Sequence, residues 1–219
     1  MAGSGTHTAG MRLPDAALAR MWGAADRLLD LYWEKRLGID TAGHVAVDYP
    51  DARPYMTLHY RIYLAMLRRC GPGGDDVVVD AGCGKGRVLC CAARFPVRRV
   101  VGVEIDPQLC AAARRNAARM RGRRAPVEVV TAAAQDFDYR EATIVIMFNP
   151  FGPQTLRKVV GRIEQSLHGN PRKLRMVYFN PVHEDLLACV PWLRRYEHWP
   201  ARLLTGMKFA VSFWQTTGR

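Results

Sequence analysis

The sequence lacks the features of a secreted, membrane-spanning or metal-binding protein. Six cysteines occur among its 219 residues, but none forms a Cys-x-x-Cys pair or stands at zinc-binding spacing from histidines. We therefore expect free thiols, no metal site and a cytoplasmic location. No apolar run is long enough to span a bilayer, so we expect no membrane association. Residues 1–10 have neither a basic nor an apolar region, so we expect a flexible leader rather than a secretory signal.

Internal repeats are also absent, and the chain divides into two segments. Residues 11–74 carry no strand pattern and predict a helical cap or lid. Apolar residues on one helical face indicate its first helix: Leu18, Met21, Trp22, Ala25, Leu28, Leu29 and Tyr32. A loop rich in glycine, aspartate and proline follows at residues 38–54. A second helix is predicted at about 57–69, before the breaker at 70–74.

Residues 75–219 alternate β-branched runs with helical stretches. The predicted strands are residues 77–80, 100–104, 127–130, 144–148, 175–180, 196–199 and 209–214. The predicted helices are residues 85–94, 107–121, 153–167 and 183–189. Because continuous apolar strands separated by helices form parallel sheets covered on both faces, we predict an α/β fold. The last two strands have no helix-length segment between them, which predicts an antiparallel hairpin.

Acidic residues are fewer than basic ones, with 20 Asp and Glu against 32 Lys and Arg. The excess is mostly arginine. It indicates either nucleic-acid binding or a compositional bias of the source. Its densest run is Arg114, Arg115, Arg119, Arg121, Arg123 and Arg124. This run ends the helix after the second strand, and such a helix runs back from the carboxyl edge of the sheet. We therefore interpret the run as a solvated face opposite the active site, and nucleic acid as the less favoured substrate.

A glycine-rich turn joins the first predicted strand to a helix, with the sequence Asp80-Ala-Gly82-Cys83-Gly84-Lys-Gly86. Glycines there permit positive φ angles and let a ligand lie on the backbone. The spacing is G-x-G-x-G, whereas a dinucleotide site has G-x-G-x-x-G. A carboxylate at the strand end would also repel a pyrophosphate but suits an ammonium group. The turn therefore favours S-adenosylmethionine over NAD.

Acidic residues also follow the next two strands. Glu104, followed by Ile105, lies about 20 residues after Gly82, the offset of an acid that binds ribose hydroxyls. Asp136 follows the third strand and has a carboxylate that can accept from an adenine amino group. Phe137 beside it can stack on the ring.

With these three signals in this order, the sequence resembles the class I S-adenosylmethionine-dependent methyltransferase family from about residue 75 onward. It is similar in particular to bacterial members with an Asn-Pro-Phe motif. The resemblance implies a Rossmann-like, seven-stranded, mostly parallel sheet of order 3-2-1-4-5-7-6. It also implies that the loop 80–86 holds the methionine part of the cofactor, Glu104 the ribose and Asp136 the adenine. S-adenosylhomocysteine would be the product.

Two strands end in Phe-Asn-Pro, at residues 148–150 and 179–181. Asn149, Pro150 and Phe151 resemble the Asn/Asp-Pro-Pro-Tyr/Phe motif of amino methyltransferases. In that family the Asn side chain and the Pro carbonyl accept hydrogen bonds from the target nitrogen, and the aromatic ring stacks on the acceptor, so that catalysis is largely positioning. This chain has one proline before the aromatic residue, so the match is partial. The alternative is a loop that starts at Asn149, with Pro153 opening the next helix.

His183, just beyond the fifth strand, is the candidate general base, because histidine titrates near neutral pH. The alternative is a solvated or capping residue. We expect the acceptor pocket between the N-terminal helices, the loops after strands four and five, and residues 200–208. The predicted function is N-methylation of a small molecule or of a protein or peptide amine. A nucleic-acid base methyltransferase and a cofactor-binding module without chemistry are the alternatives.

Overall fold

The structure is a computed structural model that describes residues 15–201 and 209–217, with the side chains of 23 onward. The expected leader at 1–10 and most of the 200–208 connection lie outside the described residues. Within the described part, no helix combines the length and the apolar character that a bilayer crossing requires.

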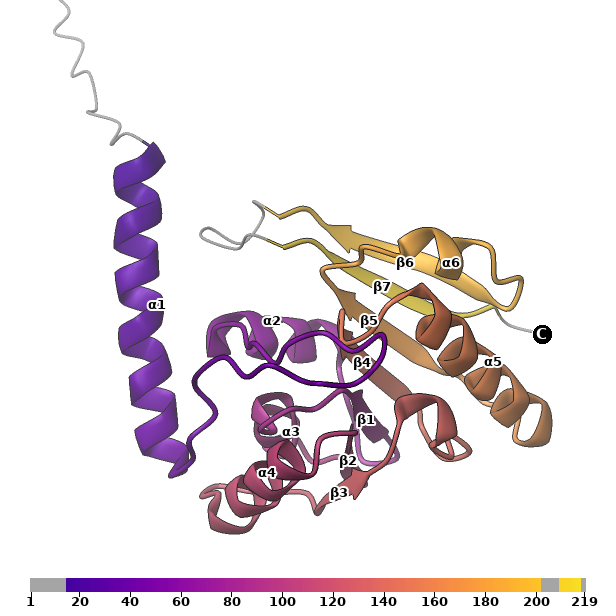
Figure 1. Cartoon of the computed structure of the whole chain (residues 1–219), viewed down its shortest axis with the longest axis horizontal. Helices are drawn as coiled ribbons and strands as arrows, with labels where there is room; N and C mark the ends of the chain where they lie inside the picture. Colours follow the sequence, from indigo (N-terminus) through magenta and orange to yellow (C-terminus); the bar gives the residue numbers. More distant parts are fainter. Residues whose placement is uncertain (1–14, 202–208, 218–219) are drawn as a thin grey trace, which may run out of the picture.

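A seven-stranded sheet forms the centre of the molecule (Figure 1). Its order is β3-β2-β1-β4-β5-β7-β6, as predicted. Strands β1 to β5 pair in parallel, while β7 pairs antiparallel with β5 and β6. The strands are β1 (Val77–Ala81), β2 (Arg99–Glu104), β3 (Val127–Thr131), β4 (Ile144–Phe148), β5 (Arg175–Phe179), β6 (Leu193–Trp199) and β7 (Val211–Thr216). The sheet is therefore the Rossmann-like sheet of the class I methyltransferases.

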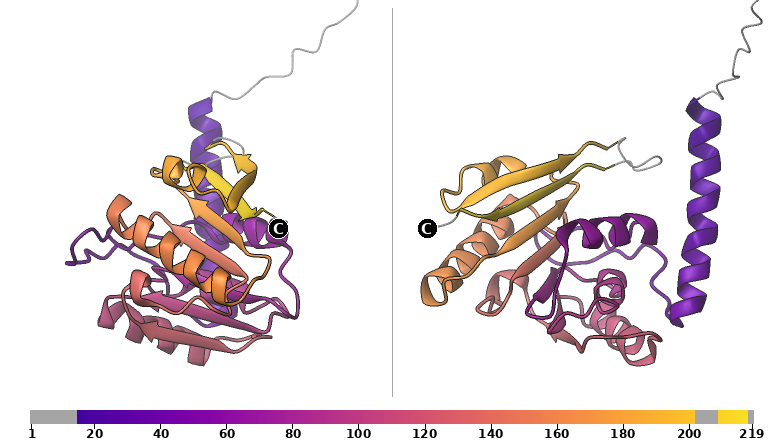
Figure 2. Two further views of the ribbon diagram at one scale, coloured as in Figure 1. Left: turned by 90° about the vertical axis from the view of Figure 1, so that its right-hand side faces the viewer. Right: turned by 180° about the vertical axis from the view of Figure 1, so that it is seen from behind.

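Helices cover both faces of this sheet and bury two apolar clusters. One cluster includes residues of α2 (Tyr60–Cys70), α3 (Arg87–Ala92) and α4 (Pro107–Arg119). The other includes residues of α5 (Pro153–Gly169), α6 (Glu184–Ala188) and the short 3-10 helix η1 (Ala134–Asp136). Because α2 is buried with the sheet, the separable part of the predicted cap is α1 (Asp15–Leu37) and the loop after it (Figure 2).

Two predicted boundaries at the end of the chain were wrong. Strand β6 begins at Leu193 instead of residue 196, and β7 spans Val211–Thr216 instead of 209–214. Arg194 and Arg195 hid the start of β6 in the sequence, because charged residues weaken a strand pattern. Both pair across to β7, opposite Gln215 and Trp214, so sheet pairing outweighs local propensity.

Helix α1 forms as predicted, but two described residues of the apolar face that indicated it are largely exposed. Leu28 is 69% exposed and Tyr32 is 50% exposed. The contacts with the body come instead from other residues of α1, both polar and apolar. Asp26 binds Arg61 of α2 through two hydrogen bonds, of 2.9 and 2.8 Å. Trp33 stacks on Tyr60 with 6.2 Å between ring centroids.

Arg87 joins these N-terminal elements to the glycine-rich turn. It begins α3 and is only 4% exposed. Its guanidinium donates to Glu34 of α1 at 2.9 Å and to the carbonyl of Leu58 at 2.8 Å. It also donates to the hydroxyl of Thr41 at 2.7 Å and lies 4.4 Å from the ring centroid of Tyr60. A single buried cation therefore contacts α1, the loop after it and α2.

The guanidinium also lies 3.4 Å from the Asp30 carboxylate. We expect Arg87→Met to lower the free energy of unfolding by about 3 kcal/mol, because Glu34 and Asp30 would lose this buried cation and keep their charges. The matched control is Arg98→Met, whose exposed pair with Glu141 contributes less than about 1 kcal/mol. Urea unfolding measures both. Equal losses in the two variants would contradict the special role of Arg87.

Candidate active site

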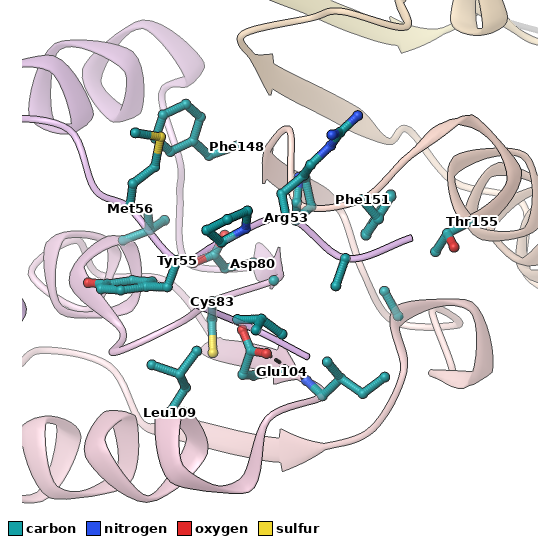
Figure 3. Close-up of a pocket in the computed structure, with 18 of the residues that line it drawn as sticks. Arg53, Tyr55, Met56, Asp80, Cys83, Glu104, Leu109, Phe148, Phe151 and Thr155 are labelled. Atoms are coloured by element: carbon teal, nitrogen blue, oxygen red, sulfur yellow. Dashed lines mark hydrogen bonds between the residues drawn. The ribbon is translucent and has the colours of Figure 1, made fainter. Parts of the chain in front are cut away.

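A cleft lies at the carboxyl edge of the sheet, below a strap formed by residues 45–57 (Figure 3). Its floor is made by the loops after β1, β2, β3 and β4, and its roof by the strap. Open α/β sheets bind ligands at this edge, where the strand order reverses. Here β1 pairs with both β2 and β4, so the cleft lies at that switch point.

The glycine-rich turn has the backbone that the sequence predicted. Gly82, Gly84 and Gly86 have φ angles of 83°, 53° and 84°. A Cβ atom on Gly82 would lie 2.4 Å from Cβ of Pro150, so a side chain there would push away the loop after β4. Gly82 and Cys83 line the cleft, and the amide nitrogens of both donate to the carbonyl of Val103. Gly86 faces Ala113 of α4 and serves helix packing.

Asp80 is a buried carboxyl group that faces the cleft, with 4% of its surface exposed. No hydrogen bond from any described residue reaches its side chain. Burial, together with the nearby charge of Glu104, raises the pKa of Asp80 to about 8. A buried carboxylate needs donors or a positive charge. An ammonium group supplies both, so the residues present fit the methionine part of S-adenosylmethionine.

Glu104 also lines the cleft, but its carboxylate is already held by the backbone. One oxygen accepts from the amide of Gly84 at 2.9 Å, and the other from Ile105 at 2.8 Å and Asp106 at 3.0 Å. These bonds fix the carboxylate against the glycine-rich turn. The oxygen bound to Gly84, Oε2, keeps a lone pair for a ribose hydroxyl. Ile105 lines the cleft next to it.

The loop after β3 meets the cleft through residues that the sequence reasoning did not select. Ala133, Ala134 and Gln135 line the cleft, whereas Asp136 and Phe137 do not. Phe137 packs edge-on against Tyr139 in the core, with ring centroids 5.0 Å apart. The assignment of Asp136 and Phe137 to the adenine stays a prediction.

The strap is fixed to the loop after β4 by backbone pairing. Ala52 and Phe151 form an antiparallel bridge, in which the amide of Arg53 donates to the carbonyl of Pro150 at 2.9 Å. The Asp51 carboxylate accepts from the amide of Thr155 at 3.0 Å and so caps α5. Burial opposes ionisation of Asp51, but the hydrogen bonds from Thr155 outweigh it and keep the pKa of Asp51 low. Asp51 and Thr155 lie more than a hundred residues apart in the sequence, so no local motif could predict their contact.

Tyr55 closes the strap over the glycine-rich turn. A Cβ atom on Gly84 would lie 2.1 Å from the Tyr55 ring, so only glycine permits this approach. The Tyr55 hydroxyl donates to the carbonyl of Thr41 at 2.6 Å. Burial raises the pKa of Tyr55, so the phenol stays protonated at neutral pH.

The predicted acceptor residues lie beside one another at the end of β4. Asn149 has a φ of 39°, and its side-chain oxygen accepts from the Tyr178 hydroxyl at 3.1 Å. Pro150 and Phe151 line the cleft, whereas Asn149 does not. The Asn149 amide therefore faces β5, and the Pro150 carbonyl already has one donor. Each acceptor oxygen has a second lone pair.

His183 lies at the start of α6, outside the cleft lining. Its Nε2 atom is buried and has no hydrogen-bond partner among the described residues. The backbone of His183 lies near the Tyr178 hydroxyl, and its ring lies near enough to the Asp51 carboxylate to influence the pKa of Asp51. The assignment of His183 as a general base therefore stays a prediction.

The comparisons with known proteins agree with this fold and cleft. Residues 78–169 match the family model described as a methyltransferase domain. The protein-lysine N-methyltransferase of Saccharolobus islandicus is 34% identical over 103 residues, which are 47% of this chain and 63% of that protein. A ribosomal protein L11 methyltransferase of Thiobacillus denitrificans is 49% identical over 45 residues, 20% of this chain and 15% of that protein. The chain thus spans less than two thirds of these curated relatives.

Solved structures show the same architecture. An RNA methyltransferase of Salinibacter ruber in complex with S-adenosyl-L-homocysteine has a TM-score of 0.58 and 25% identity, covering 75% of this chain and 95% of that one. A protein of Pyrococcus horikoshii, with a TM-score of 0.60 and 17% identity over 90% of this chain and all of that one, shows the fold alone.

Together, the switch-point cleft, the glycine-rich turn and these matches define a cofactor-binding domain of the methyltransferase class. Residues 78–169 are thus a methyltransferase domain by their family match, and the fold around them is that of the class I S-adenosylmethionine-dependent methyltransferases.

We expect the affinity for S-adenosylhomocysteine to rise with pH up to about pH 8. In the free protein the Asp80 carboxyl is mostly protonated at pH 7, and an ammonium ligand favours the carboxylate, so binding releases a proton. The affinity should change by up to about tenfold per pH unit below the pKa of Asp80. Calorimetry on the protein and on Asp80→Asn measures it. The variant should bind more weakly at pH 8 and lose this pH dependence, and an unchanged profile would exclude Asp80 from the site.

Proposed function

We propose that this protein transfers a methyl group from S-adenosylmethionine to the nitrogen of an amine, in a small molecule or in a protein or peptide. The observation that carries the proposal is the unpaired, buried carboxyl of Asp80 in a cleft that also contains Glu104, Pro150 and Phe151. Residues that would hold a cationic cofactor thus line the same cleft as two of the residues that would hold an amine acceptor, which supports the proposal. The protein-lysine and ribosomal protein methyltransferases among its relatives support a protein amine.

The cofactor supplies an electrophilic methyl group when it is bound. The residues of this chain would do the positioning. Phe151 is 7% exposed in the cleft wall, where its ring can pack against an acceptor. The carbonyl of Pro150 and the side-chain oxygen of Asn149, through the lone pair that the Tyr178 hydroxyl leaves free, would accept hydrogen bonds from the acceptor nitrogen and direct its lone pair. An amine that is already neutral needs no strong base, so His183 would be dispensable for it.

Methylation of a nucleic-acid base is the second candidate. It is favoured by the likeness to the RNA methyltransferase of Salinibacter ruber, over nearly the whole of that chain. A radiolabelled methyl donor offered to lysine peptides, small amines and RNA separates the candidates. Label in the peptide or amine fraction supports the proposal, and label in RNA alone overturns it. If S-adenosylhomocysteine binds but no acceptor gains label, the protein is a binding module.

We expect Asn149→Gly to lower kcat at least about 100-fold while the affinity for S-adenosylhomocysteine changes less than about threefold, because lost positioning acts on the transition state. Glycine keeps the positive φ at this position without strain. The matched control is Asn180→Gly at the end of β5, where φ is 47°. The control should retain most of its turnover. An Asn149→Gly enzyme with full kcat would reduce the motif to a structural turn.

A change at His183 distinguishes a nitrogen acceptor from an oxygen acceptor. For an amine acceptor, His183→Ala should change turnover near pH 8 only slightly. For a hydroxyl acceptor it should cause a loss of about 100-fold or more, because a general base is then required. Steady-state kinetics with any accepted substrate gives the answer, and the large loss would contradict N-methylation.

A further inference from the structure

The ends of α1, α3 and α4 lie near one another (Figures 1 and 2), and basic residues stand at all three ends. The backbone amide of Arg121 donates to the carbonyl of Leu37 at 2.8 Å, and that of Arg124 to Ala93 at 2.7 Å. These bonds join the end of α4 to the ends of α1 and α3. We define the basic surface as Arg36, Arg94, Arg119, Arg121, Arg123 and Arg124.

The guanidinium groups of the basic surface carry uncompensated charge. Within the described part of the chain, none of the six forms an ion pair with a carboxylate. Their side-chain hydrogen bonds go to neutral partners, such as Arg119 to Asn116 at 2.9 Å and Arg123 to the carbonyl of Ala117 at 3.2 Å. Elsewhere, arginines such as Arg61 and Arg175 are paired with aspartates. One acidic neighbour is Asp40, whose carbonyl accepts from Asn116.

Two aromatic rings of α1 lie within this surface. Arg94 lies 4.4 Å from the ring centroid of Trp33, and Arg36 lies 5.8 Å from that of Tyr32. The two rings contact each other edge-on, with centroids 5.5 Å apart. Tyr32 is half exposed, so part of its ring is open to a ligand. The sequence showed no aromatic-basic stripe, because its parts come from residues far apart.

We propose that the basic surface binds RNA. Phosphates supply the negative charges that this surface lacks, and unpaired bases can stack on an aromatic side chain between guanidinium planes. An acidic protein could also pair with the guanidinium groups, but it has no bases to stack on the exposed ring of Tyr32. The surface adjoins the ends of α3 and α4, at the edge where the strands begin, and the cofactor cleft lies at the opposite edge. It would therefore dock RNA whatever the acceptor of the methyl group is.

The experiment measures binding of a fluorescein-labelled single-stranded RNA of about 20 nucleotides by anisotropy, between about 50 and 200 mM salt. Changing Arg119, Arg123 and Arg124 together to glutamine should weaken binding at least about tenfold. It should also lower the slope of log Kd against log salt by about 2, because about three phosphate contacts are lost. Tyr32→Ala should weaken binding about fivefold or more and leave the slope unchanged.

The matched control changes Arg157, Lys158 and Arg162 of α5 to glutamine, with the same loss of charge on another exposed face. Its RNA affinity should stay within about twofold to threefold. Equal losses in the two triple variants, or no RNA binding by the unaltered protein, would overturn the proposal. Binding to vesicles with anionic lipid but not to RNA would overturn it as well. Thermal unfolding verifies that the variants are folded. The affinity for S-adenosylhomocysteine should be unchanged in the triple variant of the basic surface, so this test is independent of the test of the methyltransferase site.

Discussion

The buried guanidinium of Arg87 is the constraint on which the rest of the active site depends. A buried cation is tolerated only when carboxylates and hydrogen-bond acceptors surround it. In this chain those partners come from outside the sheet domain, from Glu34, Thr41 and the Leu58 carbonyl. The glycine-rich turn that leads into α3 therefore cannot have its native surroundings until α1 and the following loop have docked. Cofactor site and cap become one unit, although they are separate in the sequence.

This coupling continues across the cleft. Thr41 and the Leu58 carbonyl both bind Arg87, and the chain between these two contacts forms the strap. At one end of the strap, Tyr55 lies on Gly84. At its tip, Asp51 caps α5, and Arg53 pairs with Pro150. The strap thus touches the turn that would hold the methionine part and the loop that would hold the acceptor. Any movement that admits an acceptor must break contacts on both sides.

The fold was predictable because its signals are local, whereas much of the site was not. Apolar strands, the glycine-rich turn and the acids Asp80 and Glu104 each appear within a few residues of sequence. They indicate the α/β class and the cofactor edge, and the resemblance that they carry implied the sheet order. The partners of Arg87 lie 29 to 57 residues away, and that of Asp51 lies 104 residues away. The apolar face of α1 predicted a helix correctly, yet Asp26, Asp30 and Glu34 decide how it docks. Ion pairs between residues far apart in the sequence produce no periodic pattern, so the docking of α1 could not be predicted from the sequence.

The ion pairs of Arg87 distinguish it from the arginines of the basic surface. Arg87 is buried and fully partnered, so its function is structural, and it needs the cap to be present. Arg119, Arg123 and Arg124 are exposed and have no carboxylate partners among the described residues, so their charge remains available to a ligand. Both groups meet at the last turns of α1, where Glu34 faces inward to Arg87 and Arg36 belongs to the outer surface. A ligand bound on the outside of α1 would thus contact the helix that also anchors the cofactor turn. Helix α1 is therefore the physical link between the basic surface and the cleft.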